Sequence, residues 1–137
     1  MRERHIVTCF FHDGHKVLLF KRSPQVRTYA GRWAGVSGSL EQCAPREQVL
    51  REIDEELGLR PPDVKLLKEG TAFTVDDAAV GVRWIVYPFL ATMRDHSSIR
   101  LNWEHTEWRW FPLEELAALD TVPKLKETWE HLWRAST

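Results

Sequence analysis

The sequence predicts an α/β or α+β fold with a mixed sheet, because β-rich runs and amphipathic helical patterns are interleaved along the chain. Two β-rich runs, at residues 5–11 and 16–22, flank a D-G hairpin signal. One helical pattern covers residues 45–57, and a terminal one covers residues 122–135. The 137 residues match the size of one domain, which we expect to span residues 1–137.

The segments between these elements can be assigned from the same patterns. Residues 23–45 hold several glycines and prolines, and we expect a long, ordered loop there with one short strand. The later part of the chain is predicted to contain strands at 64–75 and 80–93 joined by an acidic turn at 76–79, a strand at 106–113 and a short helix at 113–119.

Composition and charge exclude several classes of function. The net charge of −1 gives no general positive field for nucleic acid or an anionic membrane, so we expect neither as a partner. Two cysteines are too few for a disulfide scaffold or a cysteine zinc site, and Cys9 is expected to be buried. No apolar run approaches the roughly 20 residues of a membrane span, and no signal-peptide pattern is visible. We therefore expect a cytoplasmic protein.

The helix predicted for residues 45–57 has clear ends. Pro45 suits its first turn, and Gly58 suits the left-handed position just after its last turn. Pro61 and Pro62 prevent the helix from continuing. Its apolar stripe consists of Val49, Leu50, Ile53 and Leu57.

Three glutamates converge near the end of this helix. Glu52, Glu55 and Glu56 stand at i, i+3 and i+4, so their carboxylates share one face. Their mutual repulsion and the helix dipole destabilise the helix by about 1–3 kcal/mol in total. A divalent cation such as Mg²⁺ or Mn²⁺ would reverse that sign, because the carboxylates then become hard oxygen ligands. The alternative is a solvated acidic face without a function.

Residues 38–59 resemble the Nudix box, whose pattern is Gly, five residues, Glu, seven residues, then Arg-Glu-aliphatic-x-Glu-Glu-x-Gly-aliphatic. The second half is matched in full by Arg51, Glu52, Ile53, Glu55, Glu56, Gly58 and Leu59. The first half departs from the pattern: the expected Glu falls on Cys43, and the expected Gly falls on Ser37, one residue before Gly38. Glu41 or Glu47 is available to replace the missing Glu, and Glu47 lies one turn before Arg51, within reach of its guanidinium.

This resemblance implies a Nudix-like α/β/α sandwich around a mixed sheet. It also implies hydrolysis of a diphosphate linkage in a nucleoside diphosphate joined to another group, with a divalent cation, usually Mg²⁺, as cofactor. Mn²⁺ is the alternative cation. The partner would be a phosphorylated small molecule. Exposed sheet edges and several late tryptophans also make a homodimer an open expectation.

The resemblance assigns roles to residues of the box. Glu52, Glu55 and Glu56 would be metal ligands, and Glu52 is also the first candidate for the general base. Arg51 would orient the glutamates, and Gly38 would let the backbone approach the metal or phosphate closely.

Candidate groups outside the box complete the predicted site. Many family members use a further glutamate, for which Glu104 is the first choice and Glu107 the second. Three arginines in or beside the loop before the box are candidates for binding phosphate: Arg22, Arg27 and Arg32. Four aromatic residues are candidates for stacking on a base, although we expect most aromatic side chains in the core: Trp33, Phe73, Trp84 and Trp103.

Two other functions stay open on the sequence alone. The missing first Glu of the box favours a non-catalytic Nudix-fold module that senses a nucleotide-like ligand or binds a partner. The three retained carboxylates favour the hydrolase, because a binding module need not keep them. An isomerase of isoprenoid diphosphates would need a paired Cys and Glu in an apolar pocket; Cys43 falls inside the box, and Cys9 has no evident acidic partner.

Overall fold

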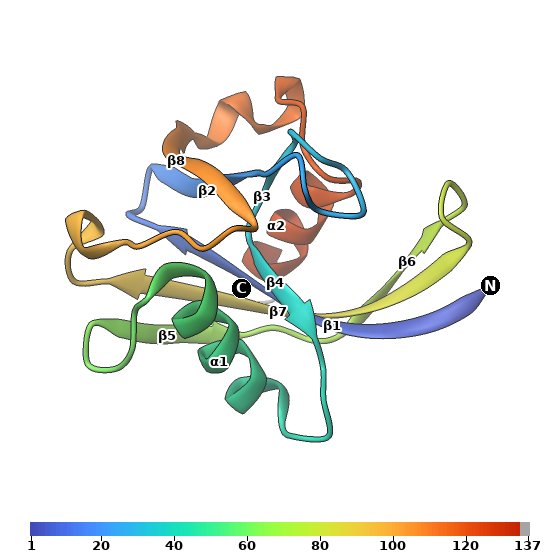
Figure 1. Ribbon diagram of the computed structural model, residues 1–137, viewed down its shortest axis with the longest axis horizontal. Coiled ribbons are helices and arrows are strands. Elements are labelled where there is room, and N and C mark those ends of the chain that lie inside the picture. Colours follow the sequence, from blue (N-terminus) through green and yellow to red (C-terminus); the bar gives the residue numbers. More distant parts are fainter. Residues whose placement is uncertain (135–137) are drawn as a thin grey trace.

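The structure, a computed structural model, describes residues 1–134, with side chains up to residue 132. The described residues form eight strands, two α-helices and two 3₁₀ helices (Figure 1). In chain order these are β1 (Arg2–His12), β2 (Lys16–Arg22), β3 (Trp33–Ala34), β4 (Val36–Ser39), α1 (Pro45–Leu57), β5 (Val64–Glu69), β6 (Phe73–Asp77), β7 (Val82–Met93), η1 (His96–Ser98), β8 (His105–Pro112), η2 (Leu113–Ala118) and α2 (Leu125–Arg134).

The strands form one mixed sheet with β1 at its centre. The main order is β3-β2-β1-β7-β5, while β4 also pairs with β1, β6 with β7 and β8 with β2. Only the β1–β7 pair is parallel among the described strands, and its register runs from Arg2↔Val82 to Phe11↔Ala91. The mixed sheet predicted from the sequence is confirmed.

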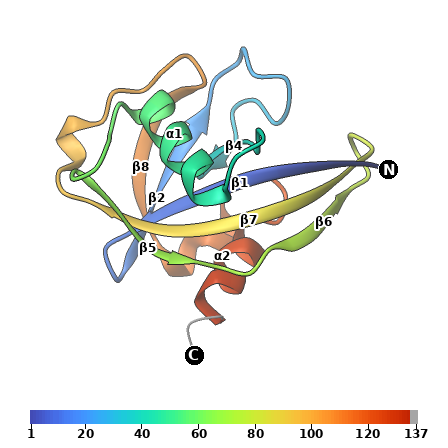
Figure 2. The same ribbon diagram turned by 90° about the horizontal axis from the view of Figure 1, so that it is seen from below.

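The two α-helices cover opposite faces of this sheet, as Figure 2 shows. Side chains of a strand alternate between faces, so neighbouring residues of β2 enter different cores. Leu18 and Phe20 join the core under α1, whereas Val17 and Leu19 join the core under α2. From the helices, α1 contributes Val49, Ile53 and Leu57 to the first core, and α2 contributes Leu125, Trp129 and Leu132 to the second. The α/β/α sandwich is therefore confirmed.

The single strand predicted at residues 64–75 is wrong. The chain forms two strands there, β5 and β6, which pair with successive parts of β7. The break lies opposite Pro88, which has no N–H to donate to a continuous ladder, while its carbonyl accepts a bond of 2.8 Å from the Gly70 N–H. The acidic turn is also displaced: Asp76 and Asp77 belong to β6, and the turn follows at residues 78–81.

Other boundaries differ in smaller ways. The loop before α1 contains two short strands, β3 and β4, in place of one. The helix predicted at 113–119 is a 3₁₀ helix, η2, and the terminal helix begins at Leu125, so that residue 135 of the prediction lies outside the described residues. Cys9 is fully buried, as predicted. Within residues 1–134, no helix has the length and apolar character needed to cross a membrane.

Candidate active site

Helix α1 buries two of its three clustered glutamates. Glu52 and Glu56 are 9% and 1% exposed, whereas Glu55 is exposed to solvent. The buried side of α1 consists of two adjacent rows at i, i+4 spacing: Gln48, Glu52 and Glu56 form the polar row, and Val49, Ile53 and Leu57 form the apolar row. A merely solvated acidic face is therefore excluded for Glu52 and Glu56.

Gly38 lies directly against the Glu52 side chain. It belongs to β4, where it pairs with Val7 of β1. A Cβ atom at position 38 would overlap the Cδ and Oε1 atoms of Glu52. The glycine thus lets the backbone of β4 and the carboxylate of α1 approach each other more closely than any other residue would allow.

Gln48 orients Glu52, a role that the sequence interpretation missed. Its Nε2 donates a hydrogen bond of 2.7 Å to Oε2 of Glu52. Its Oε1 accepts bonds from the Glu41 N–H at 3.1 Å and from the Cys43 thiol at 3.3 Å. Gln48 is only 1% exposed. Through these hydrogen bonds it connects the loop before α1 to the Glu52 carboxylate. The signal in the sequence was its position four residues before Glu52.

Arg51 does not contact the acids in this structure, contrary to the orienting role expected for it. Its side chain is exposed, and no ion pair in the described part of the chain involves it. Glu47, its suggested partner one turn earlier, is also exposed. Exposed ion pairs at this spacing are weak, about 0.3–0.5 kcal/mol, so solvent competes well for both groups.

The buried acids have raised pKa values. Burial is the main cause for both; the negative charges of Glu104 and Glu52 further raise the pKa of Glu56, which lies well above its usual range. For Glu52, the hydrogen bond from Gln48 partly offsets the effect of burial, and the charges of Glu55 and Glu104 add to the upward shift of its pKa. Each carboxylate thus resists ionisation unless positive charge is brought to it.

His105 does not supply that charge. Its Nδ1 lies 3.8 Å from Oε1 of Glu56, and the His105 and Glu56 side chains are 2% and 1% exposed. Burial, followed by the nearby charge of Arg22, lowers the pKa of His105 to about 4, so the ring is neutral at pH 7. Both the Nδ1 of His105 and the Oε2 of Glu56 are buried and have no hydrogen-bond partner among the described residues. An unsatisfied carboxylate oxygen in such surroundings is unfavourable and is a natural ligand position.

Glu104, the first choice for a further glutamate, acts electrostatically on the two buried acids. It is half-buried in the turn before β8, where its carbonyl accepts a bond of 2.8 Å from the Ser23 N–H. Its charge acts on the pKa of both Glu52 and Glu56. The second choice, Glu107, instead forms an ion pair of 3.5 Å with Arg109.

The donors of this cluster suit a hard divalent cation. Among the described residues, no three His, Cys, Asp or Glu side chains already converge as a complete metal site. The buried carboxylates of Glu52 and Glu56 and the exposed carboxylate of Glu55 nevertheless offer only oxygen ligands. One of these oxygens, Oε2 of Glu56, has no hydrogen-bond partner among the described residues. A cation would offset both the burial and the repulsion that raise the pKa values of Glu52 and Glu56.

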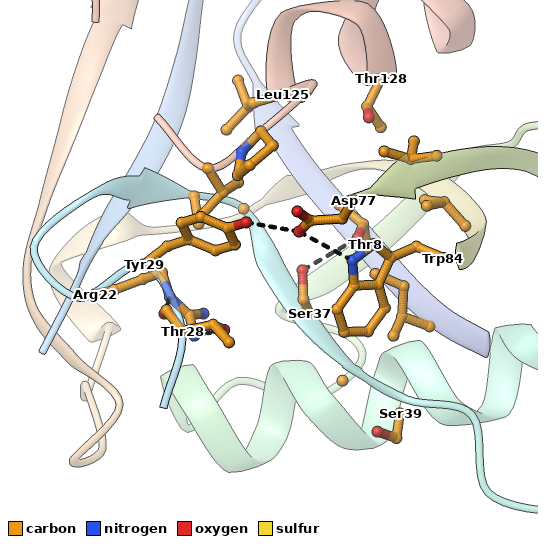
Figure 3. Close-up of a pocket in the computed structure, with 18 of the residues that line it drawn as sticks. Thr8, Arg22, Thr28, Tyr29, Ser37, Ser39, Asp77, Trp84, Leu125 and Thr128 are labelled. Carbon is orange, nitrogen blue, oxygen red and sulfur yellow. Dashed lines mark hydrogen bonds between the residues drawn. The ribbon is translucent and has the colours of Figure 1, made fainter. Parts of the chain in front are cut away.

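A cavity of about 300 Å³ lies beside the cluster (Figure 3). Arg22, Gly38 and Glu104 line it, together with Tyr29, Asp77 and Trp84. Figure 3 shows Asp77 between the Tyr29 and Trp84 side chains, with β4 passing between the cavity and α1. Glu52 and Glu56 do not themselves line the cavity; Gly38, which does, lies against the Glu52 side chain, and Glu104, which also does, acts on the pKa of both acids.

Only one of the three predicted arginines lines the cavity. Arg22 is half-buried, and its Nε donates a bond of 2.9 Å to the Thr28 carbonyl. Arg32 is directed elsewhere, to an ion pair of 3.4 Å with Asp120. Arg27 is exposed and does not line the cavity.

Of the four aromatic residues considered for stacking on a base, one lines the cavity and three lie elsewhere. Trp84 lines the cavity. Trp33 is 8% exposed and packs edge-on against Phe111 in the core, while Trp103 is 64% exposed. Phe73 packs against His131 outside this cavity.

Comparisons with known proteins agree with this fold. The profile of the NUDIX domain matches residues 1–132, and the chain therefore belongs to the Nudix family. Its structure is similar to a MutT protein from Methanosarcina mazei Go1 (TM-score 0.80, 22% identity, 99% of this chain and 96% of that chain). It is also similar to a MutT Nudix hydrolase from Burkholderia pseudomallei (TM-score 0.74, 24% identity, 96% and 99%) and to an Ap4A hydrolase from C. elegans (TM-score 0.70, 16% identity, 98% and 96%). A search of curated protein sequences finds no match.

The contact between Gly38 and Glu52 can be tested with Gly38→Ala. The added Cβ would displace the far end of a flexible side chain, so we expect the fold to lose no more than about 1 kcal/mol while the Glu52 carboxylate moves. The displacement of the Glu52 carboxylate should lower turnover of a diphosphate substrate on the order of 100-fold. Steady-state kinetics and thermal unfolding measure the two effects.

The double variant provides the control for Gly38→Ala. In a Glu52→Gln background, adding Gly38→Ala should lower turnover no further, because both changes act on the same carboxylate. Additive losses in the double variant would show that Gly38 acts on something other than Glu52.

Proposed function

We propose that this protein is a metal-dependent hydrolase that cleaves a diphosphate linkage in a nucleoside diphosphate joined to another group, or in a similar nucleotide. The observation that carries the proposal is the burial of Glu52 and Glu56 on α1, with Glu52 against Gly38, which lines a cavity together with Arg22 and Glu104. Buried, mutually repelling carboxylates are unfavourable for stability alone. Their presence next to a cavity is explained by a ligand that brings positive charge.

In this proposal Mg²⁺ or Mn²⁺ is held by the carboxylates of Glu52, Glu55 and Glu56, with the backbone at Gly38 close by. Glu55 is exposed, so it would close the site from the solvent side. When bound, the cation screens the charge of the diphosphate and lowers the pKa of a bound water.

The remaining groups of the chain have separate tasks. Arg22 binds a phosphate oxygen, because its guanidinium is half-buried and lines the cavity. Glu52 accepts the proton of the attacking water and is held in place for this by Gln48. Glu104 is the second candidate for this base, since it lines the cavity and lies near both buried acids. Arg27 and Arg32 keep no phosphate-binding role in this proposal, and Arg51 acts on the acids only if its side chain reorients.

The family and the site together support this substrate class. One similar structure is an Ap4A hydrolase, whose name describes a substrate with linked phosphates between two nucleosides. The present cavity combines an arginine with aromatic walls, which suits a phosphate chain joined to a flat ring. A non-catalytic ligand-binding module remains the alternative outcome, because Cys43 occupies the position of the first Glu of the box and bonds to Gln48.

The hydrolase is tested by incubating the protein with Mg²⁺ and a panel of nucleoside triphosphates, ADP-ribose, dinucleotide polyphosphates and prenyl diphosphates. We expect release of a mononucleotide from at least one nucleotide substrate. Glu52→Gln and Glu56→Gln should each lower turnover by about 10²–10⁴-fold, because each removes a charge from the site. Glu47→Gln, an exposed residue of the same helix, is the matched control and should retain activity.

The outcomes of this panel separate the alternatives. Binding without turnover in any arm would support the ligand-binding module, and a rearranged prenyl product would support the isomerase. Full activity in both Glu52→Gln and Glu56→Gln would show that the site is elsewhere.

The raised pKa of Glu56 predicts how stability depends on pH without metal. A carboxyl group with a raised pKa in the folded state contributes its stability below the unfolded pKa, near 4.5, and loses it as pH rises through the folded pKa. Gln does not titrate, so Glu56→Gln should match the wild type near pH 4.5 and become more stable than it by a few degrees at pH 8 in EDTA. Thermal unfolding from pH 4.5 to 8 measures the difference.

Two controls accompany this measurement. Glu47→Gln should show no gain that grows with pH, because Glu47 is exposed. Added Mg²⁺ should stabilise the wild type at pH 8 more than Glu56→Gln. A pH-independent difference between the wild type and Glu56→Gln would contradict the burial of an ionisable Glu56.

A further inference from the structure

The cavity contains a carboxylate that the proposed hydrolysis does not use. Asp77 is the last residue of β6 and is 7% exposed. Its Oδ2 accepts a bond of 2.6 Å from the Tyr29 hydroxyl and one of 3.4 Å from Nε1 of Trp84. Figure 3 shows both bonds meeting at the same oxygen. In the described part of the chain, no hydrogen bond or ion pair occupies the other oxygen, Oδ1.

The surroundings determine what Oδ1 can bind. A carboxylate oxygen is an acceptor with two lone pairs, and Oδ2 already uses both of its own. The bond to Asp77 raises the pKa of the Tyr29 hydroxyl, so the phenol stays protonated as the donor. No Lys or Arg within the described residues forms an ion pair with Asp77. A ligand that reaches Asp77 must therefore present a donor there, and its phosphates and carbonyl oxygens are repelled.

The walls beside Asp77 favour a flat ring as the group that carries this donor. Tyr29 and Trp84 come from separate segments, the loop before β3 and strand β7, and both line the cavity with Asp77. Val75 and Val86 add apolar surface. The phosphate-binding candidate Arg22 lines the same cavity, so a ligand with a ring and a phosphate chain meets complementary groups for both parts.

We propose that Asp77 is a specificity-determining residue that selects nucleotides whose base presents adjacent N–H donors, as guanine does with N1–H and its 2-amino group. This inference rests on the proposed function, because it assigns the base end of the same substrate. Adenine and cytosine place an acceptor beside their amino group. Uracil places a carbonyl on each side of its single N–H. Guanine therefore complements the two lone pairs of Oδ1 best.

The test compares GTP with ITP and with UTP. ITP keeps the N1–H donor of guanine but lacks the 2-amino group. We expect kcat/KM of the wild type in Mg²⁺ to favour GTP over ITP by about 10- to 100-fold, the usual value of one hydrogen bond to a charged group. Asp77→Asn preserves the shape of the side chain but not its charge, and it should reduce this ratio to within about threefold. Asp76→Asn is the matched control, since Asp76 bonds to Arg83 at 2.7 Å and does not line the cavity.

A second readout separates this inference from the hydrolase itself. Calorimetric titration with GMP and IMP in metal-free buffer measures the preference without catalysis, and it should favour GMP in the wild type and in Asp76→Asn but not in Asp77→Asn. Hydrolysis without a base preference, or a preference unchanged in Asp77→Asn, would overturn the role of Asp77 and leave the proposed function standing. A preference for GMP with no hydrolysis of any diphosphate would support Asp77 and overturn the hydrolase.

Discussion

The burial of two carboxylates on α1 is the constraint on which the site depends. Glu52 and Glu56 occupy a row of the helix that would be apolar in a protein built for stability alone. Gly38 of β4 leaves the space for Glu52, and Gln48 fixes the orientation of Glu52. Burial and mutual repulsion raise the pKa of both acids, so a bound cation would be favoured at this position.

The fold brings these acids close to the candidate cavity through the strand pairing of β1. Strand β4 pairs with β1 and lies over α1, which brings Gly38 to the acids and to the cavity at once. Strands β6 and β7 supply Asp77 and Trp84 to the same cavity. In the proposed function, phosphate chemistry and recognition of a ring would therefore be assigned to different elements.

The sequence predicted the α/β/α fold and the ends of α1, because these depend on periodicity, local signals and the family pattern. It did not predict Gln48 as the partner of Glu52, because the i, i+4 spacing that indicates this pair is shared by many residues on any helix. Arg51 was expected to hold the acids, but solvent competes for an exposed guanidinium. Asp77 was placed in a turn, because the two-residue displacement of that turn depends on pairing with β7, a contact distant in sequence.

The most direct measurement is anomalous diffraction from crystals of the protein soaked in Mn²⁺. If the buried carboxylates exist to hold a divalent cation, the map will show a peak on the order of 2 Å from oxygens of Glu52 and Glu56. An empty position between these two side chains, in crystals where Mn²⁺ binds elsewhere or nowhere, would contradict the account.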